Sequence, residues 1–116
     1  MRRRFVESRG FSEDRKRLER ERELSDEDMR VLEQSILADP EVGDLVPGTG
    51  GMRKVRVGQR SVRRGKRDGV RVYYLDLPRR GVCHLVAVFG KREKADLSAA
   101  ERRAVAALVQ RLKEEP

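Results

Sequence analysis

The chain contains few of the residues on which several common protein classes depend. It has one cysteine, Cys83, so no disulfide can form within the chain, and one cysteine with one histidine cannot complete a structural zinc site. Tryptophan is absent and aromatic residues make up 4% of the 116 residues, which argues against a broad aromatic platform for stacking bases. No apolar run approaches the length of a membrane span. We therefore expect a single domain in a reducing compartment, and a cytoplasmic location.

The N-terminus begins with three consecutive arginines at residues 2–4. They resemble the basic start of a signal peptide, but polar residues follow where an apolar segment is required, so we do not expect one. We expect residues 1–4 to form a flexible basic N-terminus of a single domain that spans residues 1–116.

The charged residues are abundant and mostly basic. They make up 41% of the chain, against 37% hydrophobic residues, and the formal net charge is +8 at pH 7. The apolar residues occur in patterned clusters, which is typical of a folded chain rather than a disordered one. The excess of Lys and Arg indicates a phosphate-bearing partner. A membrane surface fits less well, because no basic amphipathic helix with a bulky apolar face is visible.

Two helices are expected in the N-terminal third. Ser12 is followed by two acidic residues and has the features of an N-cap, so a helix is predicted over residues 13–23. This helix is so polar that few core contacts are expected to hold it, and it is predicted to extend into solvent. Ser25 begins a second helix with an apolar stripe at helical spacing, which ends at Asp39-Pro40.

The hydrophobic period changes from helical to extended after a glycine-rich loop at residues 43–51. Three strands are predicted at residues 52–57, 69–77 and 82–89, and their short connections make them an antiparallel meander. Ser98 and Glu101 form a capping box that opens a final helix. The predicted order is a short strand through Phe5, two helices, three strands and a helix, which places the chain in the α+β class.

Basic residues are concentrated between residues 53 and 71, where the sequence has nine of them and one acid. The strand period places Lys54 and Arg56 on one face, about 6–7 Å apart. Arg71 opens the next strand and Lys91 follows the last one, so a meander brings all four to one sheet surface. Converging cations repel one another unless an anion lies between them, so the cluster favours a phosphate site. Each side chain taken singly is better explained by solvation, and only the cluster as a whole favours nucleic acid.

No established catalytic motif is recognisable in the chain. The segment "GQRSVRRGK" has the wrong spacing for a P-loop, and "GTGG" lacks the strand and helix that flank a dinucleotide-binding loop. His84 lies within an apolar strand, where a half-buried core histidine is expected ahead of an acid or base. A single histidine so placed gives no Ser-His-Asp set.

Four segments, in this order, resemble the RelE/HigB family of bacterial toxins from type II toxin–antitoxin pairs. They are "FVES", "LSDEDMRVLEQSILADPEVGDLVPGTGGMRKVRV", "RGKRDGVRVYYL" and "AVFGKREKADLS". The resemblance runs from about Phe5 into the last helix. It implies a small α/β toxin in which an N-terminal helical hairpin packs on an antiparallel sheet, with a C-terminal helix.

The resemblance also implies an activity and a set of residues. Toxins of this family are mRNA endonucleases that act on the ribosome without metal or cofactor, and a cognate antitoxin, here expected to be of the helix-turn-helix type, neutralises each. An RNA 2′-hydroxyl attacks the adjacent phosphate. Arg71 and Lys91 match positions expected to stabilise the transition-state charge, and Lys54 to activate the 2′-hydroxyl or add to the field. Arg56 is the fourth catalytic candidate. RNA contacts are expected from Arg53, Arg64, Lys66, Arg67 and Lys94.

The chain departs from the family at Phe89, where several relatives carry a tyrosine that can transfer a proton. Tyr73 and Tyr74 are the candidates for that role, and Tyr74 is equally well explained as a core residue. Two other functions remain open. A non-catalytic RNA- or DNA-binding module, including an inactive toxin homologue, predicts salt-sensitive binding without cleavage. A protein-interaction domain with an acidic partner predicts no salt-dependent RNA affinity.

Overall fold

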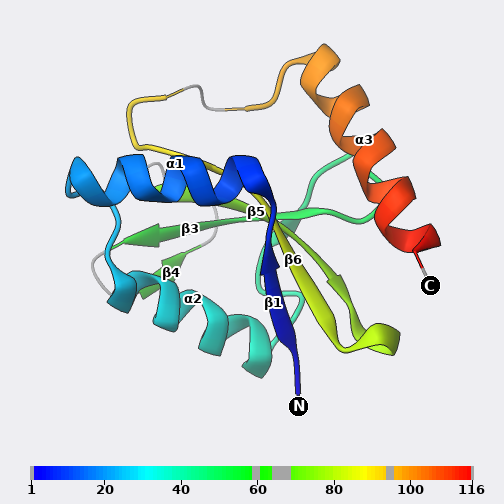
Figure 1. Cartoon of the computed structure of the whole chain (residues 1–116), viewed down its shortest axis with the longest axis horizontal. Coiled ribbons are helices and arrows are strands. Elements are labelled where there is room, and N and C mark those ends of the chain that lie inside the picture. The colour runs from blue at the N-terminus through cyan, green and yellow to red at the C-terminus, as the bar shows by residue number, and fades with distance from the viewer. Residues whose placement is uncertain (1, 59–60, 64–68, 94–95, 116) are drawn as a thin grey trace.

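The chain folds as an α+β structure, with helices packed on one β-sheet (Figure 1). The computed structural model describes residues 2–58, 61–63, 69–93 and 96–115, and only the backbone of residues 61–63. The predicted order of elements is confirmed, and two short strands, β2 and β4, are added. The elements are β1 (Arg4–Glu7), α1 (Arg9–Arg20), α2 (Asp26–Ala38), β2 (Asp44–Leu45), β3 (Arg53–Gly58), β4 (Ser61–Arg63), β5 (Val70–Leu77), the 3-10 helix η1 (Pro78–Arg80), β6 (Val82–Phe89) and α3 (Ala99–Glu114).

The sheet is mixed, whereas the sequence indicated an antiparallel one. In the described ranges its strand order is β1-β6-β5-β3-β2, and β4 pairs with β3. The strands β3, β5 and β6 pair antiparallel as predicted, but β1 pairs parallel with β6, with Phe5 opposite Cys83. A parallel pair needs a long connection, and the chain between β1 and β6 contains α1, α2 and the other strands. None of the described helices is both long and apolar enough to cross a membrane.

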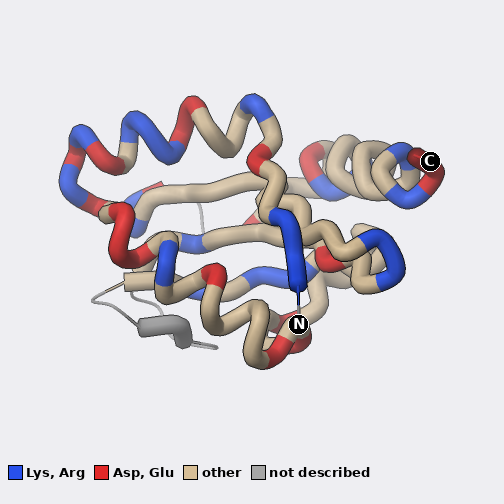
Figure 2. Tube along the Cα trace, turned by 60° about the horizontal axis from the view of Figure 1, so that its bottom comes forward, with Lys and Arg blue, Asp and Glu red and all other residues tan. Residues whose placement is uncertain are grey.

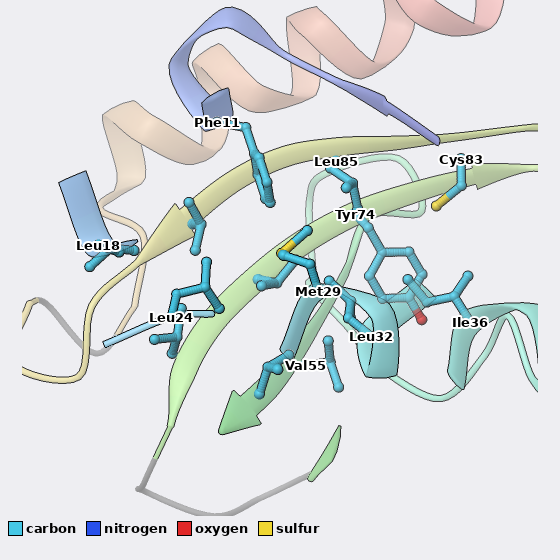
Figure 3. Close-up of a cluster of buried hydrophobic side chains, with 14 residues drawn as sticks. Phe11, Leu18, Leu24, Met29, Leu32, Ile36, Val55, Tyr74, Cys83 and Leu85 are labelled. Carbon is cyan, nitrogen blue, oxygen red and sulfur yellow. The ribbon is translucent and has the colours of Figure 1, made fainter. Parts of the chain in front are cut away.

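Successive side chains of the strands point alternately into two apolar clusters on opposite faces of the sheet. One cluster joins α1 and α2 to side chains such as Val55 and Tyr74, which Figure 3 shows together. The other joins α3 to Met52, Tyr73 and further residues of β5 and β6. The predicted alternation of residues 52–57 is therefore confirmed. Each large aliphatic side chain fully buried in these clusters contributes about 1.5–3 kcal/mol to stability.

The helix α1 begins before the predicted N-cap. The true N-cap is Ser8, whose Oγ accepts a hydrogen bond from the Phe11 N–H at 3.0 Å and donates one to the Val86 carbonyl at 2.8 Å. Ser12 lies inside the helix. Phe11 and Leu18 are fully buried, so α1 packs on the sheet instead of extending into solvent. Two buried apolar residues, seven positions apart on the same side of the helix, thus pack this polar helix against the sheet.

The other two helices begin where the sequence predicts. The Ser25 hydroxyl accepts a hydrogen bond from the Asp28 N–H, and the Asp28 carboxylate accepts one from the Ser25 N–H. Ser98 and Glu101 form the same reciprocal arrangement at α3. Both capping boxes satisfy backbone N–H groups that the first helical turn leaves without partners.

Two residues of the expected flexible N-terminus contact the sheet. The Arg3 guanidinium donates hydrogen bonds of 2.8 and 3.2 Å to the two carboxylate oxygens of Asp76 on β5. The Arg4 N–H donates to the Gly81 carbonyl at 2.8 Å, where β1 begins. These contacts hold Arg3 and Arg4 on the sheet, so this part of the N-terminus is not the flexible segment that the sequence indicated.

The loop between α2 and β3 is fixed by Tyr74. The Tyr74 hydroxyl donates to the Pro40 carbonyl at 2.7 Å and accepts from the Gly43 N–H at 3.0 Å. A Cβ at Gly43 would lie 2.8 Å from the Lys54 carbonyl oxygen, so only glycine fits so close to β3. Burial raises the pKa of Tyr74 to about 12. Tyr74 is thus a core residue that holds the loop.

Candidate functional site

The pairing of β3 with β5 gathers basic residues on the α3 side of the sheet. Arg56 lies directly opposite Arg71, and Lys54 lies directly opposite Tyr73. The valines between them on both strands belong to the cluster on the α1 and α2 side. The register therefore places Lys54, Arg56 and Arg71 on one surface, which we call the cation face.

The cation face holds two guanidinium groups in one cross-strand pair. Like charges directly opposite each other on neighbouring strands destabilise a sheet. Arg71 is 3% exposed, and its burial, with the charge of Arg56, lowers the pKa of its guanidinium. A positive potential is therefore built into this part of the sheet.

The guanidinium of Arg71 is directed at the turn that follows β6. Its Nη2 donates to the carbonyls of Gly90 and Glu93 at 3.2 and 2.6 Å. Lys91 lies in this turn, is exposed, and donates its N–H to Glu23 Oε1 at 2.9 Å. The structure thus brings the backbone of Lys91 close to Arg71, and leaves its side chain in solvent. Arg71 itself is covered.

Lys54 is paired with an acid that the sequence did not associate with it. Its Nζ lies 3.1 Å from Asp96 Oδ1, ahead of α3. The hydrogen bond from Lys54 and its charge lower the pKa of Asp96, with smaller effects from Arg102 and Arg71. The Lys54 side chain is 23% exposed and that of Asp96 67%, so solvent screens the pair. The two residues are 42 positions apart, and no local pattern signals the contact.

Tyr73 is the tyrosine on the cation face. It is 1% exposed, and within the described part of the chain its hydroxyl has no hydrogen-bond partner. Its ring meets Phe89 edge to face, with centroids 5.7 Å apart. Burial raises the pKa of Tyr73, and the charge of Asp96 raises it further. Of the two tyrosines considered for proton transfer, Tyr73 is therefore the one beside the cations.

Other expected site residues lie elsewhere or outside the described residues. Arg53 is on the opposite face of β3, where it donates to the Gly43 carbonyl at 2.8 Å and lies 3.6 Å from Glu41. His84 is partly buried on β6, and burial lowers its pKa. The four remaining RNA-contact candidates fall outside the described ranges: Arg64, Lys66, Arg67 and Lys94.

The described residues contain no group of three or more His, Cys, Asp or Glu side chains arranged to hold a metal ion. A comparison with models of known protein families finds none that matches the chain. The candidate site is therefore defined by its own geometry. It consists of the cations of β3 and β5, the turn after β6, and Asp96.

Proposed function

We propose that the protein is the toxin of a type II toxin–antitoxin pair, with a RelE-like fold and the activity of a ribosome-dependent mRNA endonuclease. The observation that carries this proposal is the register of β3 and β5, which sets Lys54, Arg56 and Arg71 on one surface. An RNA phosphate neutralises such a cluster and offers acceptors to its partly exposed members, Lys54 and Arg56. The sequence resemblance described above supports the same activity and implies a cognate antitoxin as partner.

The proposed reaction needs no group besides the RNA and the protein. The 2′-oxygen attacks the adjacent phosphorus and loses its proton, while the 5′-oxygen of the next nucleotide leaves and takes up a proton. Negative charge grows on the phosphate oxygens as the phosphorus becomes five-coordinate. Fixed cations aimed at those oxygens stabilise the transition state more than the ground state.

The burial of each cation assigns it a different part in this reaction. Lys54 and Arg56 are partly exposed and reach the phosphate from the sheet surface. Arg71 is covered, so it acts as a positioning residue through the turn that it holds and adds to the positive potential. Lys91 meets the RNA from that turn. Tyr73 lies beside these cations but, like Arg71, it is buried, so its phenol packs beneath the surface that the RNA would meet.

The test compares Arg56→Ala with Arg30→Ala. Arg30 is an exposed arginine on α2, on the other side of the sheet, so both variants lose the same charge. We expect wild type to arrest bacterial growth and cut mRNA on translating ribosomes. Arg56→Ala is expected to lower the cleavage rate about 10²- to 10³-fold, as for the loss of one transition-state donor. Arg30→Ala should cleave like wild type. Absence of cleavage by wild type contradicts the proposal.

A non-catalytic RNA-binding module is the second candidate. It is favoured by Phe89, which cannot transfer a proton, and by the pairing of Lys54 with Asp96. This candidate predicts that wild type binds single-stranded RNA with an affinity that falls with salt, and that it leaves mRNA intact on ribosomes. The same purified protein therefore separates the two functions.

A further inference from the structure

We propose that Glu93 and Arg17 are positioning residues of the site, which hold the Gly90–Glu93 turn against α1 and so fix the cations of that turn beside the cation face. This inference rests on the proposed function. It adds a part of the molecule, α1, that the proposed reaction does not use.

The Gly90–Glu93 turn is closed by its own hydrogen bonds. The Glu93 N–H donates to the Gly90 carbonyl at 3.2 Å, and the Gly90 N–H donates to Glu93 Oε1 at 2.8 Å. Arg71 closes the turn from the sheet side by bonding both carbonyls. The carboxylate of Glu93 is therefore one of the hydrogen-bond acceptors that close the turn.

The helix α1 and the residues after it hold the turn from the other side. Arg17 Nη2 lies 2.6 Å from Glu93 Oε1, and Glu23 Oε1 accepts the Lys91 N–H at 2.9 Å. A Cβ at Gly90 would lie 3.0 Å from both Glu23 Oε1 and Leu18 Cδ2, so the turn is seated closely on α1. Figure 2 shows that basic and acidic residues alternate with others along α1. The ion pair with Glu93 connects Arg17 of this helix to the turn.

The turn presents Lys91 and Arg92 to solvent, and both are exposed. Glu93 is charged at neutral pH: burial alone would raise its pKa, but the Gly90 N–H and the Arg17 guanidinium outweigh that effect and lower it. A carboxylate next to a phosphate site weakens RNA binding through its charge. If Glu93 acted only through its charge, removing it would strengthen RNA binding and leave cleavage unchanged or faster. If Glu93 positions the turn, removing it slows cleavage, so the direction of the change in cleavage rate separates the two roles.

The experiment compares Glu93→Ala and Glu93→Gln with the control Glu21→Gln. Glu21, the residue that follows α1, pairs with the same Arg17 at 3.3 Å, so the control removes one acid without touching the turn. Two kinds of measurement are made. Hydrogen exchange is followed at the Gly90 and Lys91 amides of the free protein, and kcat and KM are determined for mRNA cleavage on translating ribosomes. Urea unfolding of each variant separates a change in the site from a loss of fold.

We expect Glu93→Ala to exchange the Gly90 amide faster and to lower kcat about 10- to 100-fold with little change in KM, as misplacement of a reacting group does. Glu93→Gln keeps an acceptor for the Gly90 N–H, so its kcat should fall less. Glu21→Gln should match wild type in both kcat and hydrogen exchange. Cleavage by Glu93→Ala at or above the wild-type rate overturns the inference. If Glu93→Ala does not fold, Glu93→Gln and Arg17→Gln decide by the same two readouts.

The failure of this inference is distinct from failure of the proposed function. If wild type does not cleave mRNA, the proposed function fails, and hydrogen exchange still decides whether Glu93 holds the turn. Unchanged exchange at Gly90 and Lys91 in Glu93→Ala overturns the inference whatever the activity. Faster exchange confined to the turn supports it.

Discussion

At the scale of single residues, Tyr73 and Tyr74 show that two adjacent residues of a strand can have different environments. They point to opposite faces of β5, and both are buried. Tyr74 makes two hydrogen bonds to the loop before β3, whereas the Tyr73 hydroxyl has no partner in the described chain. Alternation predicts that their faces differ. It does not predict which hydroxyl is satisfied, because both partners of Tyr74 are backbone groups more than thirty positions away.

The two hydroxyls are expected to contribute differently to stability. Tyr74→Phe leaves the Gly43 N–H and the Pro40 carbonyl without their partner, so we expect it to lower the free energy of unfolding by about 1–3 kcal/mol. Tyr73→Phe removes a hydroxyl that forms no described hydrogen bond and is expected to be neutral or slightly stabilising. Urea denaturation of both variants measures the difference. Equal losses would contradict the hydrogen-bond assignment.

At the scale of elements, the start of α1 was set by a distant contact. The acids after Ser12 predict that residue as the N-cap. The structure chooses Ser8, because its hydroxyl also reaches the Val86 carbonyl on β6 and because a helix from Arg9 buries Phe11. Tertiary packing thus outweighs the local dipole preference, which is worth only a few tenths of a kcal/mol to about 1 kcal/mol.

The two serines provide a matched test of this assignment. Ser8→Ala is expected to destabilise the fold by about 1–2 kcal/mol, since it removes the N-cap and the contact with β6. Ser12→Ala removes a hydroxyl that donates to Glu7 at 2.7 Å within a partly exposed region, and we expect a smaller loss. Thermal or urea unfolding gives both values. A larger loss for Ser12→Ala would show that the helix begins later than described here.

The strands were predicted more completely than the contacts between distant elements. Alternation over residues 52–57 and 69–77 was sufficient to place Lys54, Arg56 and Arg71 on one face, because a short connection leaves few ways to pair two such strands. The burial of Arg71 and the pairing of Lys54 with Asp96 depend on contacts with residues that follow β6. The parallel pairing of β1 depends on the whole intervening chain. Local patterns contain no information on such contacts.

At the scale of the whole molecule, the placement of charge is as important as its total. The net charge of +8 attracts any polyanion, and α1 combines basic and acidic residues that pair with one another. On the cation face Lys54 pairs with Asp96, but the register also sets Arg56 directly opposite Arg71, so two like charges lie on neighbouring strands. Two variants with the same net charge should therefore bind RNA differently.

Asp96→Asn and Asp26→Asn test this dependence on placement. Asp26 pairs with Arg15 at 3.1 Å, away from the cation face. Each variant loses one negative charge, so the two have the same net charge. We expect Asp96→Asn to bind single-stranded RNA several-fold more tightly at about 50 mM salt, with a smaller gain at about 200 mM, because Lys54 is released to a phosphate. Asp26→Asn should change little. Fluorescence anisotropy measures both, and equal affinities would mean that net charge alone governs binding.

The pairing of β1 with β6 has a consequence for how the chain is made. β1 is synthesised well before its partner, residues 82–85 of β6, and before Val86, which accepts the hydrogen bond from Ser8. Contacts between such distant segments form late and slow the folding of a domain. A nascent chain that ends before residue 82 leaves β1 unpaired and lacks the turn that Arg71 holds. A protein proposed to cut messages on ribosomes is thus unable to assemble its site until its chain has been synthesised through Glu93.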